Sequence, residues 1–134
     1  MGVKLSTDDI RIIAAFEKIT KVHARDCLVT ENGVIFLVDA GKVGLAIGKE
    51  GAIIKKVSAL LGKPVKVFAH AETPEELVKS MVASVKTVER TGTIIVMTIP
   101  QKDRSVVIGK GGANINILKL LLKRHFGITD VRLR

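Results

Sequence analysis

The sequence predicts an α+β fold made of two tandem αββααβ units, each with a three-stranded sheet covered by helices on one face. Three observations lead to this prediction. Apolar residues at helical spacing alternate with short β-prone runs. Two glycine turns, Asn32-Gly33 and Thr91-Gly92, each join a pair of such runs. Finally, IGKEG at 47–51 recurs as IGKGG at 108–112.

The first unit is expected to begin with a helix, because Ile12 and Phe16 start a run of apolar residues at helical spacing. Ser6, followed by Asp9, resembles a helix cap, and Gly62 is placed to end the last helix of the unit. The expected elements are a helix over 7–20, strands over 24–29 and 34–38, helices over 43–47 and 52–61 around a loop at 48–51, and a strand over 65–69.

The second unit is expected to repeat this order. Thr73, Pro74 and Glu76 have the pattern of a helix N-terminus, and Pro100 follows the second hairpin. The expected elements are a helix over 74–83, strands over 85–90 and 93–99, helices over 104–108 and 113–127 around a loop at 109–112, and a strand over 128–133.

The two units align as an internal duplication. At an offset of 61 residues, Ile47 and Gly48 find identical partners, as do Lys49, Gly51 and several aliphatic residues that follow. Identity at these positions within the same order of elements favours duplication over coincidence. We therefore expect two domains, at 1–71 and 72–134.

Composition indicates a polyanionic partner. The 134 residues carry 22 Lys and Arg against 13 Asp and Glu, a net charge of +9, which favours nucleic acid. With no Trp, no Tyr and four Phe, the chain cannot easily build the aromatic stacking platforms of many single-strand binders. A binding surface based on backbone contacts and aliphatic side chains is expected instead.

Each Gly-x-x-Gly loop lies just before a predicted helix, where free N–H groups and the positive end of the helix dipole suit a phosphate. Lys49 and Lys110 add one cation to each loop. A structural helix-to-helix turn is the alternative for either copy alone. A P-loop is excluded because Ser or Thr does not follow either lysine, and a Rossmann fingerprint is excluded because its third glycine is replaced by Asn114.

A Gly-x-x-Gly loop between helices, in an αββααβ order, resembles the type II KH domain family. The resemblance implies a loop that clamps the backbone of about four nucleotides of single-stranded RNA or DNA. The implied clamp consists of Gly48, Lys49, Glu50, Gly51, Gly109, Lys110, Gly111 and Gly112. The implied groove for the bases is aliphatic and consists of Ala46, Ile47, Ile54, Val107, Ile108 and Ile115.

The tandem arrangement resembles the archaeal form of the NusA family over essentially the whole chain. The segments that carry this resemblance are KVGLAIGKEG at 42–51, HAETPEELVKSMVAS at 70–84, DRSVVIGKGG at 103–112 and KRHFG at 123–127. The resemblance implies an RNA-binding factor in transcription elongation or termination, with RNA polymerase as a second partner. Glu50 departs from a wholly basic loop, and Gly111 removes a side chain, so the two loops need not bind equally.

Other charged residues add to this picture without indicating chemistry. Lys55, Lys56, Lys102 and Arg104 flank the loops and are expected to meet phosphates, or else to form a solvated helix face. The three His residues show no metal-ligand spacing, and neither a carboxylate pair nor a nucleophile with a nearby base is evident. We expect no enzyme activity, no cofactor and no metal.

The sequence thus predicts a monomeric cytoplasmic binder of single-stranded RNA, without a membrane partner. Three alternatives remain at this point. A ribosome-associated or ribosome-assembly factor would use the same module, an enzyme acting on nucleotides would turn over a phosphate substrate, and a protein-interaction module would retain vestigial loops.

Overall fold

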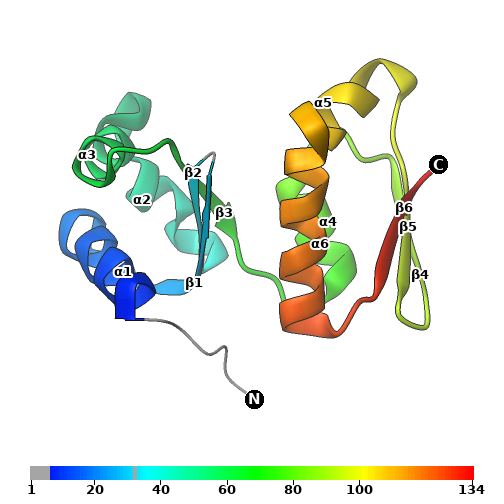
Figure 1. The fold of residues 1–134 in the computed structure, drawn as a ribbon, viewed down its shortest axis with the longest axis horizontal. Helices are drawn as coiled ribbons and strands as arrows, with labels where there is room; N and C mark the ends of the chain where they lie inside the picture. The colour runs from blue at the N-terminus through cyan, green and yellow to red at the C-terminus, as the bar shows by residue number, and fades with distance from the viewer. Residues whose placement is uncertain (1–6, 32) are drawn as a thin grey trace. The chain divides into compact units, whose positions relative to one another are not determined.

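The computed structural model describes residues 7–31 and 33–134. The chain forms two compact units that divide between His70 and Ala71 (Figure 1). Each contains one three-stranded sheet and helices, which confirms the predicted α+β fold. Ser6 and Asn32, to which the sequence assigned a helix cap and a turn, lie outside the described residues.

In the first unit the central strand pairs with a neighbour on each side. Strand β1 is antiparallel to β2, and β3 is parallel to β2 on its other edge. Helices α1, α2 and α3 lie on one side of this sheet (Figure 1). The elements are α1 (Thr7–Thr20), β1 (Ala24–Thr30), β2 (Gly33–Val38), α2 (Val43–Ile47), α3 (Ala52–Leu61) and β3 (Val65–Ala69).

The second unit repeats the element order and the sheet topology. Strand β5 is central, with β4 antiparallel and β6 parallel to it, and α4 and α6 lie on one side of the sheet (Figure 1). The elements are α4 (Pro74–Met81), β4 (Thr87–Thr91), β5 (Ile94–Thr98), α5 (Arg104–Ile108), α6 (Ala113–Phe126) and β6 (Asp130–Leu133).

Several predicted ends in the second unit were wrong. Helix α4 stops at Met81, two residues before the expected end, because Val82 is already extended with φ −119° and ψ 90°. The amide of Val85 donates to the carbonyl of Val82, and this turn delays β4 until Thr87. Strand β6 starts two residues late, at Asp130.

The core of the first unit is centred on two aromatic rings. Phe16 of α1 stacks on Phe36 of β2, with ring centroids 4.0 Å apart and an interplanar angle of 15°. Both side chains are fully buried, and aliphatic residues from α1, α2, α3 and all three strands pack around them. These contacts hold α2 and α3, and with them the loop that joins the two helices, against the core.

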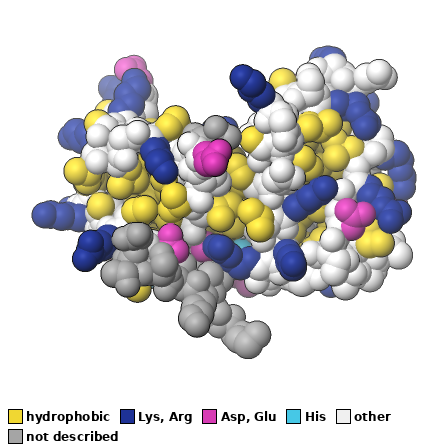
Figure 2. Space-filling model, viewed as in Figure 1, with side chains coloured by type: hydrophobic (Ala, Val, Ile, Leu, Met, Phe, Trp, Pro, Cys, Tyr) yellow, Lys and Arg dark blue, Asp and Glu magenta, His cyan; other side chains and the backbone are white. Residues whose placement is uncertain are grey.

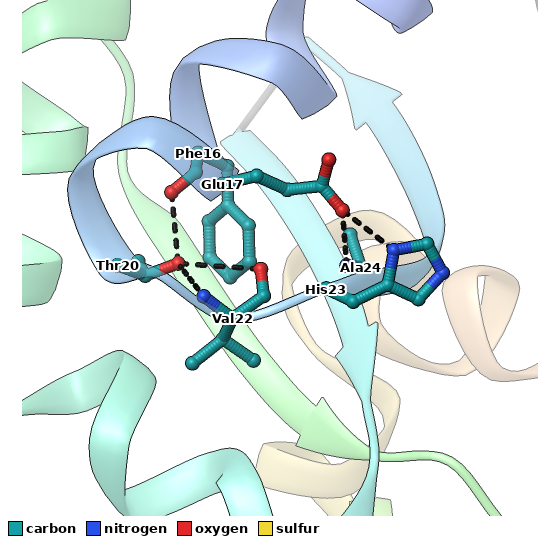
Figure 3. A network of polar contacts seen from close by, with 6 residues as sticks. All are labelled: Phe16, Glu17, Thr20, Val22, His23 and Ala24. Carbon is teal, nitrogen blue, oxygen red and sulfur yellow. Dashed lines mark hydrogen bonds and ion pairs between the residues drawn. The ribbon is translucent and has the colours of Figure 1, made fainter.

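A buried hydroxyl joins α1 to β1 (Figure 3). Thr20 Oγ1 donates to the carbonyl of Phe16 at 2.8 Å and accepts from the amide of Val22 at 3.1 Å. Because Thr20 is buried, this hydroxyl has to find partners within the protein, and it does so on both sides of the turn.

Glu17 makes a second link across the same turn (Figure 3). Its Oε2 accepts from the amide of Ala24, the first residue of β1, at 2.9 Å, and lies 2.8 Å from Nδ1 of the exposed His23. One side chain of α1 thereby satisfies the first backbone donor of the strand.

The second unit buries aliphatic residues from both main helices and the sheet. The fully or nearly fully buried members are Leu77, Val78, Ile95, Met97, Ile99, Leu118, Leu121, Leu122, Ile128 and Val131. Within the described chain no single helix is long and apolar enough to cross a membrane. Residues 101–108 and 110–126 meet that test only together, as a pair bent by 49° at the loop between them.

Candidate nucleic-acid interface

The two Gly-x-x-Gly loops have the same backbone conformation. Corresponding φ and ψ angles at the first, third and fourth positions differ by at most 8° between the units. The first loop has φ/ψ of 77°/174° at Gly48, 56°/25° at Glu50 and 76°/16° at Gly51. The second has 78°/168° at Gly109, 64°/18° at Gly111 and 81°/13° at Gly112.

The first glycine of each loop is required by packing as well as by its backbone angles. A Cβ atom at Gly48 would lie 2.7 Å from Cγ1 of Ile53, and one at Gly109 would lie 2.8 Å from the backbone nitrogen of Asn114. Asn114 is itself held in place, because its side-chain amide donates to the carbonyl of Val106 at 2.9 Å. The start of the following helix therefore closes tightly over this glycine.

The middle and end of each loop are open instead. Around a Cβ at Gly51 the nearest atom would be 3.7 Å away, and a Cβ at Gly111 would meet nothing within 4 Å. Gly51 and Gly112 are the N-cap residues of α3 and α6, and neither helix has a side-chain cap in the described structure. The amides of Ala52 and Ala113, the first residues of α3 and α6, already donate to the carbonyls of Lys49 and Lys110. A ligand at either helix end would therefore meet the N–H groups that follow them.

The charged side chains of the loops point to solvent. Lys49, Glu50 and Lys110 are exposed, and within the described residues neither lysine forms an ion pair. Both lysines are available to an anion, and Glu50 places a carboxylate beside the first of them. On the face shown in Figure 2, Lys and Arg side chains are spread over both units among few acidic ones.

The expected flanking cations differ in exposure. Lys55, Lys56 and Lys102 are exposed, whereas Arg104 is half-buried at the start of α5. All four lie on the helices or turns that border a loop. Lys55 and Lys56 lie in the helix that follows the first loop, whereas α5 separates Lys102 from the second loop.

The expected aliphatic groove residues are less accessible. Ala46 is fully buried and Ile115 is 8% exposed, so both side chains belong mainly to the cores. Ile47, Ile54, Val107 and Ile108 are half-buried beside the loops. Only the half-buried members offer surface to a base.

A hollow of about 400 Å³ lies in the second unit between α6 and the segment leading into β6. It starts close to the loop, because Nδ2 of Asn116 lies 3.6 Å from where a Cβ of Gly112 would be. Its lining residues are Asn116, Lys119, Leu120, Lys123, Ile128, Thr129, Asp130 and Val131.

Asp130, one of the lining residues, has a carboxylate that is held by its neighbours in β6. The guanidinium of Arg132 donates to its Oδ2 at 3.1 Å, and this hydrogen bond is the main reason why the pKa of Asp130 is lowered. Desolvation opposes the shift, while the amide of Val131, which donates to Oδ1 at 2.9 Å, and the charge of Lys119 add to it. The carboxyl group is consequently ionised at neutral pH.

The KH domain family matches residues 10–87, more than half of the chain. The chain belongs to the KH domain family. It is also 34% identical, over 99% of both chains, to a protein of Halobacterium salinarum named "Probable transcription termination protein NusA". A protein of the same name from Methanocaldococcus jannaschii is 33% identical over 97% of this chain and 74% of its own length. The chain is therefore an archaeal-type, NusA-like KH protein.

A solved structure has the same fold. The crystal structure of APE1850 has 34% sequence identity and a TM-score of 0.82, and the match covers 97% of this chain and 100% of that one. The KH family match contains the first loop and ends at residue 87, before the second loop. Similarity of the second loop to the first therefore depends on the repeated sequence and the shared backbone angles.

Sequence reasoning missed one pair of exposed residues next to the KH loops. Leu45 is 58% exposed and Val106 is 71% exposed, and each lies three residues before the first glycine of its loop. An aliphatic side chain exposed at the same place in both units is a candidate contact for a base. The alignment of the repeats could have identified this pair, because both positions are aliphatic in helices too short to bury every apolar side chain.

Sequence reasoning also missed the hollow of the second unit, and none of its lining residues was singled out as a candidate site. Among residues 7–31 and 33–134, no group of three or more His, Cys, Asp or Glu side chains is arranged to hold a metal ion. Cys27, the single cysteine of the sequence, is buried.

Proposed function

We propose that this KH protein is a non-catalytic binder of single-stranded RNA, built from two type II KH domains at residues 1–71 and 72–134. Each Gly-x-x-Gly loop holds the sugar-phosphate backbone, with Lys49 or Lys110 and the uncapped helix N-terminus contacting phosphates. The half-buried aliphatic residues beside each loop contact the bases.

The observation that carries this proposal is the repeated loop conformation. Lys-Glu stands between the glycines in one loop and Lys-Gly in the other, yet the backbone angles differ by at most 8°. Glu50 adopts a left-handed conformation that costs an L-residue about 1 kcal/mol or more. The first loop keeps the same backbone geometry as the second despite this cost. This supports a binding role that both loops share, in addition to their role as turns.

We further propose a role in transcription elongation, termination or antitermination, with RNA polymerase as a partner. The names of the relatives support this part of the proposal, since they are probable transcription termination proteins similar over nearly the whole chain. A ribosome-associated or ribosome-assembly factor is the alternative. Affinity purification of the tagged protein separates the two, because the first predicts polymerase subunits and the second predicts small-subunit ribosomal proteins.

RNA binding is tested by titrating a labelled single-stranded RNA dodecamer and following fluorescence anisotropy at about 50 and 200 mM salt. The native protein is expected to bind with an affinity that falls as salt rises. Replacing both loop lysines, Lys49→Glu and Lys110→Glu, should weaken binding by at least about tenfold, because each lost charged contact is worth about 1.5–3 kcal/mol.

The chain offers a matched control for this experiment. Lys18 and Lys79 are exposed, lie in α1 and α4, and occupy equivalent positions of the two units. The double variant Lys18→Glu, Lys79→Glu changes the net charge by the same amount away from the loops. Equal losses in both double variants would mean that RNA is attracted by diffuse charge alone, and no binding by the native protein would overturn the proposal.

A further inference from the structure

The two loops differ in the residue that closes over their first glycine. In the first unit Ile53, the second residue of α3, packs its hydrocarbon side chain against Gly48. In the second unit the corresponding residue is Asn114, whose backbone nitrogen and side chain lie against Gly109. Neither arrangement leaves room for a Cβ on the glycine, so the close packing is shared. Only Asn114 adds a hydrogen-bond donor at this place.

The side chain of Asn114 ties the end of one helix to the start of the next. Its Nδ2 donates to the carbonyl of Val106 at 2.9 Å, although one residue precedes the loop and the other follows it. Carbonyls in the last turn of a helix lack an intrahelical partner, and α5 has only five residues. The hydrogen bond therefore satisfies a carbonyl of α5 and restrains the start of α6 relative to it. Isoleucine has no donor, so Ile53 cannot make the same bond in the first unit.

The loop that has this bond is also the one with more backbone freedom. Three of its four residues are glycines, and the first loop has Glu50 where the second has Gly111. Glycine loses more conformational freedom than any other residue when it is ordered. A Cβ at Gly111 would meet nothing within 4 Å, so this part of the loop is not held by close packing. A restraint from outside the loop consequently matters more in the second unit than in the first.

We propose that Asn114 is the positioning residue of the second loop, which it holds in the conformation that binds an RNA phosphate. This inference rests on the proposed RNA-binding function and assigns part of it to a residue that does not need to touch RNA. A loop that is ordered before binding loses less conformational entropy when the ligand arrives, so its affinity is higher. Asn114 thereby keeps Lys110 and the free amides of α6 in place for a phosphate. In the first loop, part of this restriction comes from the side chain of Glu50 itself.

The first measurement is the affinity for the RNA dodecamer, followed by fluorescence anisotropy, of variants at position 114. Asn114→Ala removes the donor from an exposed residue and should weaken binding about fivefold, the effect of one lost hydrogen bond. Asn114→Ile reproduces the residue of the first unit, which packs without donating, and should bind no better than Asn114→Ala. Native affinity in Asn114→Ala would refute the proposal, and native affinity in Asn114→Ile would show that packing alone is enough.

Hydrogen exchange separates an effect on the loop from a loss of the fold. The amides of Gly112 and Ala113 donate to carbonyls within the loop, so they report whether it is ordered. In Asn114→Ala both amides should exchange about fivefold faster in the free protein. The amides of Ile95 and Leu121, in the core of the second unit, should keep their native rates. Unchanged exchange in the loop, or faster exchange that extends to the core, would contradict a positioning role.

The freedom of the loop supplies a further test. Gly111→Asn adds a side chain that tolerates the left-handed conformation of this residue, φ 64° and ψ 18°, and reduces the freedom of the unbound loop. The effect of Gly111→Asn on affinity should be about threefold more favourable in the Asn114→Ala background than in the native one, because the loop then has more freedom to lose. Equal effects in both backgrounds would mean that Asn114 acts independently of loop order, and the proposal would fail.

Gln101→Ala is the matched control. Gln101 is also an exposed residue with a side-chain amide in the second unit, and α5 separates it from the loop in the sequence. This variant should keep the native affinity and the native exchange rates of the loop amides. A loss equal to that of Asn114→Ala would remove the special role of Asn114. If the native protein binds RNA and Asn114→Ala binds equally well, only the positioning role is wrong, whereas no binding by the native protein would overturn the proposed function itself.

Discussion

The first glycine of the Gly-x-x-Gly loop should be much harder to replace than the last one. In Gly48→Ala the new Cβ would lie 2.7 Å from Cγ1 of Ile53, at a backbone conformation, φ 77° and ψ 174°, that L-residues rarely adopt. In Gly51→Ala the nearest atom would lie 3.7 Å away, and φ 76° with ψ 16° is the milder left-handed helical conformation. Comparing these two variants separates the effect of close packing from the effect of backbone strain within one loop.

The expected losses in the free energy of unfolding differ about threefold. For Gly48→Ala, backbone strain costs about 2 kcal/mol and the displacement of Ile53 costs a similar amount. Alanine also reduces the conformational freedom of the unfolded chain, which stabilises the protein by roughly 0.7 kcal/mol and leaves a net loss of about 3 kcal/mol. For Gly51→Ala, about 1.5 kcal/mol of strain less the same offset leaves roughly 1 kcal/mol.

Native-state hydrogen exchange is the suitable assay, because the two compact units can open separately and the chain has no Trp or Tyr for fluorescence. Amides of Phe36 and Val57 report on the first unit, and those of Ile95 and Leu121 serve as internal controls in the second. Equal losses at the first-unit amides in Gly48→Ala and Gly51→Ala would refute the role assigned to Ile53. A loss below about 1 kcal/mol in Gly48→Ala would refute the strain argument as well.

Three further predictions concern other residues. Glu50→Gly should raise the stability of the first unit by up to about 1 kcal/mol, seen by the same exchange measurement, because the strain of a left-handed L-residue is removed. It should also tighten RNA binding several-fold, because a carboxylate beside the phosphates is removed. Thr20→Val should cost about 1–2 kcal/mol in urea unfolding followed by circular dichroism, because the buried amide of Val22 loses its acceptor; a cost near zero would show that the hydroxyl is dispensable. The lowered pKa of Asp130 means that its contribution to stability is fully present above its unfolded pKa of about 3.9 and is lost as pH falls through the lower folded value. Melting temperatures measured down that acid range should therefore fall less in Asp130→Asn than in the native protein, and parallel curves would contradict the assignment.

Much of the fold followed from local patterns. The stretch from Thr7 to Thr20 was predicted as a helix at the bounds that the structure gives, and the strand Val65–Ala69 likewise. Apolar spacing, glycine stops and turn pairs are properties of neighbouring residues, so a sequence can display them without a three-dimensional context. The end near Val82 failed because no glycine or proline marks it, and a turn hydrogen bond from the amide of Val85 to the carbonyl of Val82 decides it. The start of β6 failed because Gly127 marks the end of α6 and not the residue where the strand begins.

In the candidate site, too, some features follow from the sequence and others only from the tertiary structure. The sequence by itself determined the duplicated Gly-x-x-Gly loops, their lysines and the basic charge, because each depends on residue identity and spacing alone. Only the tertiary structure decided that Ala46 and Ile115 are buried, that Gly48 is closed over by Ile53, and that α6 and β6 share a hollow. The physical reason is that burial, close contact and a shared hollow depend on how helices and strands pack together in three dimensions. In the second unit they depend on the path by which the end of α6 returns the chain to the sheet. That path brings together side chains from a helix and a strand whose separation along the chain predicts no contact between them.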